Sequence, residues 1–388
     1  MRPRPRCLIF NPYFAVLGGG ERYTVALGEA IAHSHDVVYA SPHPPDAELA
    51  RQLGFPPVEV AALTTRAFSG ASASYDLAVV ITLGLPPRSF ATTSLLVVQF
   101  PRDPAVTGNR LRSFMIRRQL RRYHRVVYSA FARDWLRQRW GVDAVVIHPP
   151  VELGGEATTP KARVILAVGR FLGRASDQWN SKRQDVLIDA FAKLPEDVRT
   201  KWRLVLAGGV APSPEMDAYL EDLRNKAKGL DVTLEVNVSP ERLQALLATA
   251  RLFWHASGFD RPSSAPERAE HFGISTAEAM SHRVIPLVFA DGGQVEIVEP
   301  HCGRLWRSVP ELVEQTTELA RSSDRQLDDL GAAARAASLR FGRDRFDREV
   351  QELIEQIGAT RVGSRIAHAL RLRWRRLRSR VHVSTTRP

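Results

Sequence analysis

Two glutamates separated by seven residues have the clearest potential for chemistry in this sequence. They are Glu270 and Glu278, the first and ninth residues of the segment EHFGISTAEAM. A helix that begins near Gly273 would leave Glu270 in the preceding loop and place Glu278 in its second turn. The backbone N–H groups of Gly273, Ile274 and Ser275 would then lie at a helix N-terminus, where unpaired donors favour an anion such as a diphosphate.

Two cations in a second segment suit the same kind of ligand. Arg170 follows the apolar run ARVILAVG, and Lys182 begins the segment KRQDVLIDAF. Both side chains can bind a phosphate, arginine as a planar fork and lysine as a point charge. Each of them alone, like a lone helical glutamate, is more often an ordinary surface charge. The prediction of a phosphate site therefore depends on their occurring together.

A run of three glycines near the N-terminus adds a third phosphate-binding element. The segment NPYFAVLGGGER suggests a strand, a loop containing Gly18, Gly19 and Gly20, and then a helix. Consecutive glycines let backbone amides come close to a phosphate. The segment matches neither GxGxxG nor a Walker A sequence, so it disfavours nicotinamide and ATP as ligands.

Short apolar runs alternate with longer amphipathic stretches, which is typical of βαβ units around a parallel sheet. The alternation starts again after the polar segment GGEATTP. We therefore expect two doubly wound α/β domains, with the site in the cleft between the carboxyl ends of their strands, and a helical C-terminal extension. The predicted divisions are an N-terminal domain at 1–153, a linker at 154–160, a C-terminal domain at 161–342, a closing helix at 343–358 and a basic amphipathic tail at 359–388.

The composition is that of a soluble globular protein. The chain has 388 residues, of which 44% are hydrophobic and 25% charged, and this is enough for two cores. No apolar stretch approaches the ~18 residues that cross a bilayer, and the opening MRPRPRCLIFNP is expected to be a first strand rather than a signal peptide. Cys7 and Cys302 are far apart and lack neighbouring ligands. We predict neither a disulfide nor a metal site.

The net charge of +12 is concentrated in two arginine-rich segments. Eight arginines and no acidic residue lie between Pro104 and Arg133, and nine arginines and no acidic residue between Gly358 and Pro388. In the second segment a helix would gather its apolar residues on one face: Ile366, Leu370, Trp374, Leu377 and Val381. Such a helix can bind an anionic bilayer, whereas a solvated disordered end and a helix docked on the body are alternatives.

Taken together and in order, these motifs resemble those of the family-4 retaining glycosyltransferases of the GT-B fold. EHFGISTAEAM with VIPLVFADGGQVEIV is similar to that family's C-terminal signature, LAVGRF with SKRQDVLIDAF to its phosphate segment, and GGGER to its glycine loop. The similarity extends from about Leu8 to Phe346. GGGER and EHFGI resemble in particular the mannosyltransferases that elongate lipid-linked oligosaccharides.

The resemblance implies a role for each residue of the site. Glu270 would contact hydroxyls of the transferred sugar, and Arg170 and Lys182 would neutralise the diphosphate, without a metal cofactor. Glu278 would bind the ribose hydroxyls of the nucleotide. The predicted donor-binding set is Gly19, Gly20, Gly273, Ile274, Ser275, Glu278 and His255.

Two positions depart from the pattern of the family. Gln99 stands where such enzymes often carry a histidine, on the acceptor side of the cleft. Its amide can bond a sugar hydroxyl but cannot act as a base. Arg283 replaces the usual glycine before the final strand. His255, at a strand end, is expected either to be a structural, hydrogen-bonded histidine or to contact the donor.

We therefore expect a hexosyltransferase that moves mannose or a similar sugar from a nucleoside diphosphate sugar to a lipid-linked or cell-envelope glycan. It would be cytoplasmic and bound peripherally to the inner face of the membrane through its basic tail. The alternatives are a non-catalytic relative, a sugar-nucleotide epimerase or a soluble disaccharide synthase of the same fold. A nucleic-acid-binding protein is suggested by charge alone, without a recognition motif, so we expect no nucleic-acid partner.

Overall fold

The computed structural model of the protein describes most of the chain. It covers residues 3–52, 54–82, 85–99, 110–155, 159–172, 181–210, 213–261 and 265–359. The basic tail predicted at 359–388 lies, beyond Ala359, outside the described residues, as does part of the predicted linker.

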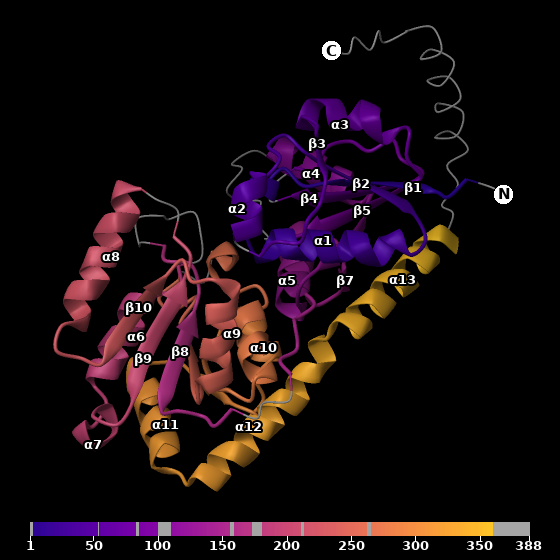
Figure 1. Ribbon diagram of the computed structural model, residues 1–388. Coiled ribbons are helices and arrows are strands. Elements are labelled where there is room, and N and C mark those ends of the chain that lie inside the picture. Colours follow the sequence, from indigo (N-terminus) through magenta and orange to yellow (C-terminus); the bar gives the residue numbers. More distant parts are fainter. Residues whose placement is uncertain are drawn as a thin grey trace, which may run out of the picture.

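Two parallel sheets form the centres of two domains (Figure 1). Within the described residues, the N-terminal sheet has seven strands in the order β3-β2-β1-β4-β5-β6-β7, and the C-terminal sheet has six in the order β10-β9-β8-β11-β12-β13. In each sheet the chain moves outward from its first strand and then crosses to the other side, which places ligand sites at the carboxyl ends of the strands. The predicted fold class of two doubly wound parallel-sheet domains is confirmed.

The strands are short, apolar and mostly buried, as parallel sheets covered on both faces require. In β1, for example, only the first residue, Arg6, is exposed. The N-terminal strands are β1 (Arg6–Phe10), β2 (Asp36–Ser41), β3 (Val60–Ala62), β4 (Leu77–Thr82), β5 (Thr93–Val98), β6 (His124–Val127) and β7 (Val145–Val146). The C-terminal strands are β8 (Val164–Val168), β9 (Arg203–Gly208), β10 (Val232–Val236), β11 (Leu252–His255), β12 (Ile285–Phe289) and β13 (Arg304–Trp306).

Several helices begin at serine caps followed closely by proline, a strong local signal for a helix start. Ser213 accepts a hydrogen bond from the backbone N–H of Met216, and Ser239 accepts one from Arg242. The N-terminal helices are η1 (Phe14–Val16), α1 (Gly19–Ala32), α2 (Ala47–Gln52), α3 (Thr65–Ser72), α4 (Arg110–Leu120), α5 (Ala130–Trp135) and the π-helical turn η3 (Leu136–Trp140). The C-terminal ones are α6 (Gln184–Ala192), α7 (Glu196–Arg199), α8 (Pro214–Ala227), α9 (Pro240–Thr249), η4 (Pro266–Arg268), α10 (Ile274–Ser281), η5 (Gly292–Glu296), α11 (Val309–Arg321), α12 (Asp324–Ser338), η6 (Leu339–Phe341) and α13 (Arg343–Ala359).

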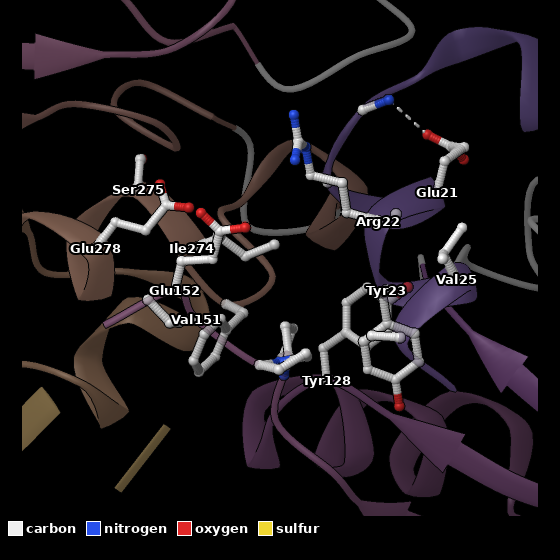
Figure 2. Close-up of a pocket in the computed structure, with 18 of the residues that line it drawn as sticks. Glu21, Arg22, Tyr23, Val25, Tyr128, Val151, Glu152, Ile274, Ser275 and Glu278 are labelled. Carbon is white, nitrogen blue, oxygen red and sulfur yellow. Dashed lines mark hydrogen bonds between the residues drawn. The ribbon is translucent and has the colours of Figure 1, made fainter. Parts of the chain in front are cut away.

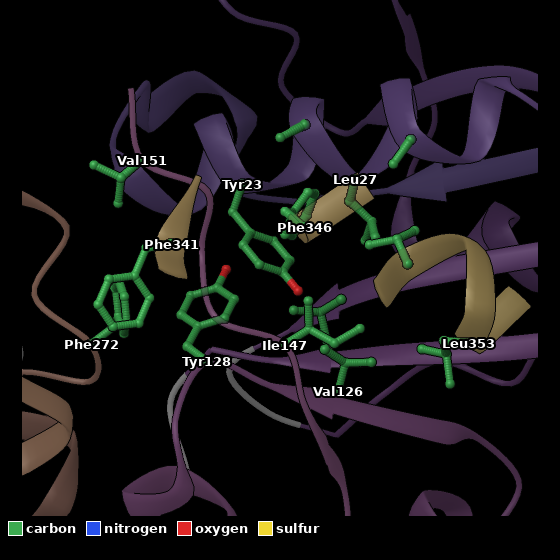
Figure 3. Packing of buried hydrophobic residues seen from close by; sticks show 14 of the residues in the cluster. Tyr23, Leu27, Val126, Tyr128, Ile147, Val151, Phe272, Phe341, Phe346 and Leu353 are labelled. Atoms are coloured by element: carbon green, nitrogen blue, oxygen red, sulfur yellow. The ribbon is translucent and has the colours of Figure 1, made fainter. Parts of the chain in front are cut away.

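The last helix, α13, returns from the C-terminal domain and packs on α1 of the N-terminal domain (Figure 1). Its apolar positions Phe346, Val350, Leu353, Ile354 and Ile357 are all buried in one cluster. Figure 3 shows Phe346 beside Tyr23 of α1, with their ring centroids 5.4 Å apart. This packing fixes α13 to the N-terminal domain, although it follows the C-terminal domain in sequence.

One local prediction needs correction. The three glycines were expected to form a loop, but α1 already begins at Gly19, so Gly19 and Gly20 lie in its first turn. Glu21 explains this early start, because its carboxylate accepts a hydrogen bond from the backbone N–H of Gly18 at 2.9 Å. A side chain in the third helical position thus satisfies a donor at the helix N-terminus.

Across the described residues, none of the helices combines the length and the apolar composition that crossing a membrane requires.

Candidate active site

A cavity of about 1000 Å³ lies between the two domains, at the carboxyl ends of both sheets. Its walls come from α1, from the loops after β5 and β8, from the start of α10 and from α13. Ten of the predicted site residues line it: Gly19, Gly20, Gln99, Arg170, Lys182, Glu270, Gly273, Ile274, Ser275 and Glu278. Residues nearly 260 positions apart in sequence therefore share one cavity.

The first turns of α1 and α10 face each other across the cavity. A Cβ atom added to Gly19 would lie 3.0 Å from Cδ1 of Ile274, so these walls nearly touch. Gly273 precedes α10 with a φ of 105°, a conformation that favours glycine, and no side chain caps the helix. Backbone N–H groups of two helix N-termini are thus directed toward one space, an arrangement that favours an anion.

Glu270 is the centre of a buried charged group. It forms an ion pair with Lys182, and its Oε2 lies 3.3 Å from Nε2 of His255. Only 13% of its side chain and 19% of that of Lys182 are exposed, so the pair is largely shielded from water. Burial alone would raise the pKa of Glu270, but the charge of Lys182 and the contact with His255 hold that pKa well below its usual value. Glu270 is therefore a carboxylate held in a fixed position.

His255 lies behind Glu270 and does not line the cavity. Its Nδ1 accepts a hydrogen bond from the backbone N–H of Ser257 at 3.3 Å, which leaves the proton on Nε2, facing Glu270. Burial lowers the pKa of His255, although the neighbouring Glu270 raises it in part, and this favours the neutral ring. Of the two roles predicted for His255, this geometry places it as a structural partner of Glu270.

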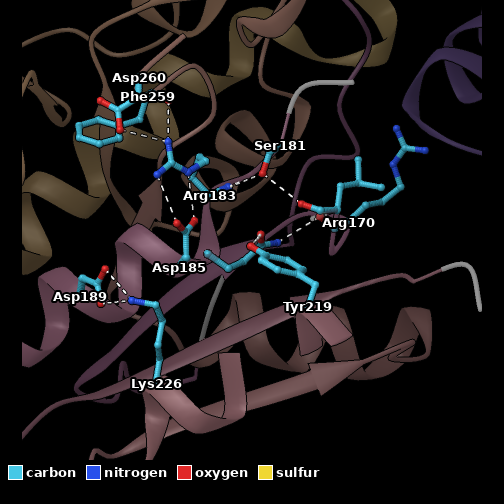
Figure 4. A network of polar contacts seen from close by, with 11 residues as sticks. Arg170, Ser181, Arg183, Asp185, Asp189, Tyr219, Lys226, Phe259 and Asp260 are labelled. Carbon is cyan, nitrogen blue, oxygen red and sulfur yellow. Dashed lines mark hydrogen bonds and ion pairs between the residues drawn. The ribbon is translucent and has the colours of Figure 1, made fainter. Parts of the chain in front are cut away.

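A network of polar contacts holds the backbone of Arg170 beside the cavity (Figure 4). The Nε2 of Gln184 donates to the backbone carbonyl of Arg170 at 3.1 Å, and its Oε1 accepts from Tyr219 at 3.1 Å. Arg183, with a left-handed φ of 51°, turns inward and donates to the carboxylate of Asp185. Arg183 does not line the cavity, whereas its neighbour Lys182 does.

Two glycines after β12 support the loop that carries Glu270. The backbone N–H of Gly293 donates to the carbonyl of Glu270. A Cβ atom on Gly292 would lie 2.2 Å from that carbonyl oxygen, and one on Gly293 would lie 2.1 Å from the carbonyl oxygen of His271. These distances leave no room for any side chain, because the obstructing atoms belong to the backbone.

Replacing Gly293 with alanine should therefore displace the Glu270 loop. We expect the free energy of unfolding to fall by about 1–3 kcal/mol, as for other overpacking substitutions, and ligand binding in the cavity to be lost. Urea unfolding and binding measurements check this expectation. Gly155, whose Cβ atom would meet nothing within 4 Å, is the matched control, and Gly155→Ala should change neither quantity. Normal binding by Gly293→Ala would contradict the proposed rigidity of the loop.

Glu278 has two charged neighbours that sequence reasoning missed. Figure 2 shows the carboxyl groups of Glu278 and Glu152 directed toward one another, with Arg22 across the cavity. Burial raises the pKa of Glu278 to about 7, Arg22 lowers it in part, and Glu152 raises it further. Glu152 follows β7 in the connection between the domains, and Arg22 extends from α1. Arg22 is the last residue of the GGGER motif, and this was the only sequence signal that pointed to it.

The two departures from the family pattern have clear structural settings. Gln99 is 4% exposed and lies against Gly20, where an added Cβ atom would be 2.5 Å from Nε2. Arg283 has a φ of 62°, in the left-handed region where glycine is favoured. Arg283 does not line the cavity. Gln99 therefore belongs to the site, and Arg283 to a turn outside it.

The C-terminal helix also contributes to the cavity, which its sequence did not suggest. Arg343, Arg345 and Arg348 of α13 line it on the side of the N-terminal domain. Arg345 donates to Nδ1 of His148 at 3.2 Å. In the sequence, only the apolar face of α13 stood out, because its arginines have the same pattern as those on any solvated helix surface. Among the described residues, no group of three or more His, Cys, Asp or Glu is arranged to hold a metal ion.

Residues 156–336 match the protein family described as "Glycosyl transferases group 1". The chain is 25% identical over 239 residues to the GDP-Man:Man(3)GlcNAc(2)-PP-Dol alpha-1,2-mannosyltransferase of Dictyostelium discoideum, an alignment that covers 58% of this chain and 45% of that protein. It is 28% identical over 225 residues to the GDP-mannose:cellobiosyl-diphosphopolyprenol alpha-mannosyltransferase of Xanthomonas oryzae, covering 54% and 51%. These alignments span about half the length of the curated relatives.

Solved structures extend the similarity to both domains. Alr3699/HepE of Anabaena, in complex with UDP and glucose, superposes with a TM-score of 0.67 at 18% identity over 91% of this chain and 100% of that one. A glycosyltransferase from Rickettsia africae gives 0.70 at 15% identity over 92% and 99%. The fold is therefore GT-B. Residues 156–336 are similar to group 1 glycosyltransferases, and the chain has mannosyltransferase homologues at modest identity.

Proposed function

We propose that this protein is a retaining hexosyltransferase that uses a nucleoside diphosphate sugar, with mannose or a similar sugar as the transferred group. One observation carries the proposal. A single cavity combines two facing helix N-termini, the fixed Lys182–Glu270 pair and the carboxyl group of Glu278. A diphosphate, a sugar and a ribose each find a suitable partner there.

The proposed donor would lie along the start of α10. Glu278 would accept hydrogen bonds from the ribose hydroxyls, and the first N–H groups of α10 and α1 would surround the diphosphate. Arg170 and Lys182 supply positive charge to it, which is the basis for proposing that no metal is needed. Glu270, whose pKa is held low, would orient hydroxyls of the transferred sugar rather than exchange protons.

In the transfer step, the bond between the anomeric carbon and the distal phosphate oxygen breaks, and the nucleoside diphosphate leaves with the electron pair. The acceptor hydroxyl oxygen forms the new bond on the same face, and its proton passes to the departing phosphate. Negative charge on the leaving group is greatest in the transition state. Preorganised cations and amides stabilise that charge without reorganising, so they accelerate the step.

The acceptor in this proposal is a lipid-linked or cell-envelope glycan at the cytoplasmic face of the membrane. Two curated relatives are named for mannose transfer from GDP-mannose, in both cases to a glycan carried on a lipid diphosphate. A solved structure of the same fold holds UDP and glucose. These names support a nucleoside diphosphate sugar as the donor, and they make guanine and uracil the first bases to test.

A thermal-shift panel of UDP, GDP, ADP and TDP with their sugars tests the proposal directly. A ligand at a hundred times its dissociation constant stabilises the folded state by ~2.7 kcal/mol, so one base should stand out. Transfer to a lipid-linked glycan then distinguishes a transferase from an epimerase, a disaccharide synthase or a non-catalytic relative. If no nucleotide stabilises the protein, the proposal is wrong.

Gln99 allows a separate prediction about the acceptor side. An amide can orient a sugar hydroxyl but cannot take its proton, so Gln99→Ala should keep part of the activity. The pH dependence of kcat should be the same in the parent and the variant. Gln119→Ala, a change at a partly buried glutamine that does not line the cavity, is the control. Complete loss of turnover with normal substrate binding would contradict this role.

A further inference from the structure

Helix α4 exposes three large apolar side chains on its outward face. Leu111, Phe114 and Met115 are 67%, 61% and 57% exposed, the three highest values among the large hydrophobic residues described. Their spacing places them within one sector of about 100° on the helix. Ile116 and Leu120 lie on the opposite face and are buried in the domain. The helix is therefore anchored by one apolar face while it presents a second one to solvent.

Every charged residue of α4 and of the turn after it is an arginine. Arg118 falls in the same outward sector, and Arg117, Arg121 and Arg122 are also exposed. No acidic residue occurs in the sequence from Pro104 to Arg133. An occupant of this surface must therefore combine apolar groups with negative charge. Nucleic acid would use the arginines but leave Leu111 and Met115 in water.

The topology places the start of α4 at the same edge of the sheet as the cavity. β5 ends at Val98 at the cleft edge of the sheet, and the next residue, Gln99, lines the cavity. α4 connects β5 to the parallel strand β6, so it runs back from the carboxyl edge, and its first turns lie toward the cleft. Leu111, Phe114 and Met115 belong to those turns.

We propose that the face formed by Leu111, Phe114, Met115 and Arg118 docks on the surface of an anionic lipid bilayer. The apolar side chains enter the boundary between headgroups and acyl chains, and the arginines bind lipid phosphates. Docking there brings the acceptor side of the cavity to the level of the headgroups. This account of the acceptor's route rests on the proposed function, whereas docking itself is a separate property of α4.

Flotation of the full-length protein with vesicles tests the docking without donor or acceptor. The vesicles contain phosphatidylcholine alone or phosphatidylcholine with phosphatidylglycerol. Phe114→Ser with Met115→Ser should lower the partition coefficient on anionic vesicles by about ten- to a hundred-fold, because two apolar side chains no longer enter the bilayer. Arg118→Gln should lower it by about fivefold and weaken its dependence on salt.

Leu49→Ser, a change at an exposed apolar residue on α2 of the same domain, is the matched control and should bind as the parent does. A circular dichroism spectrum and a melting temperature equal to those of the parent show that each variant is folded. Unchanged flotation of the Phe114 and Met115 variant would overturn the proposal, since other parts of the chain would then account for binding. Equal partition of the parent on neutral and anionic vesicles would overturn the role of the arginines. Loss of binding to a single-stranded oligonucleotide, with vesicle binding retained, would identify nucleic acid as the occupant instead.

Discussion

Replacing Lys182 with alanine should lower kcat for sugar transfer by about 100- to 1000-fold, with a much smaller effect on donor affinity. Lys182 faces the cavity beside the start of α10, where a departing diphosphate would gain charge. Removing one preorganised group that stabilises such charge typically has an effect of this size. Single-turnover kinetics with the donor identified by the thermal-shift panel measures the change.

The same substitution also leaves Glu270 as a buried carboxylate without its main cation. Because the pKa of Glu270 is depressed in the folded protein, its charge stabilises the fold above the unfolded pKa, and that contribution is lost as the pH falls through the folded pKa. Lys182→Ala should remove it and destabilise the protein near neutral pH by about 3 kcal/mol.

A double variant separates catalysis from stability. Lys182→Met with Glu270→Gln removes both charges while preserving the approximate volume of the side chains, so stability should recover. Activity should not recover, because neither charge is present to act on the substrate. If the double variant were active, the pair would be a structural ion pair and not part of the catalytic site.

The sequence predicted the scaffold and most of the residues that the structure brings together in the cavity, because each depends on local signals. Alternating apolar runs specify parallel strands, and a glycine at a left-handed position specifies where α10 begins. The positions of Glu270 and Glu278 relative to that helix followed directly from their spacing. The order of strands in each sheet follows from general rules for doubly wound folds.

Other features depend on contacts between distant segments, which a single sequence does not reveal. Glu152 meets Glu278 only because the connection between the domains passes beside α10. The arginines of α13 line the cavity because that helix packs on α1, more than 300 residues earlier. His255 was placed correctly at the end of a strand, but the same strand end could face the ligand or the loop of Glu270. The exposed apolar face of α4 has the same spacing as a buried one, so only the fold shows which face is outward.

Replacing Glu278 with alanine should weaken binding of the nucleoside diphosphate sugar by about 10- to 150-fold. A hydrogen bond to a charged acceptor contributes about 1.5–3 kcal/mol, and Glu278 is the carboxyl group placed in the second turn beyond the N-terminus of α10. Isothermal titration calorimetry measures the loss, with circular dichroism to verify the fold. Glu215→Ala, on the exposed first turn of α8, is the control and should bind normally.

The raised pKa of Glu278 adds a second, less intuitive result. In the folded protein burial raises that pKa from 4.5 to about 7. Ionisation of Glu278 therefore destabilises the ligand-free fold increasingly as the pH rises from the unfolded pKa to the folded pKa. Glu278→Gln should therefore be more stable than the parent without ligand at about pH 8, by on the order of 1–3 kcal/mol.

Donor affinity of the parent should rise between about pH 6 and pH 8, because the carboxylate form binds, while that of Glu278→Gln stays low at every pH. A variant that is more stable yet binds the donor poorly would show that this carboxylate is kept for the ligand and not for the fold. Equal stability and equal affinity at both pH values would show instead that Glu278 faces neither the ribose nor a buried environment.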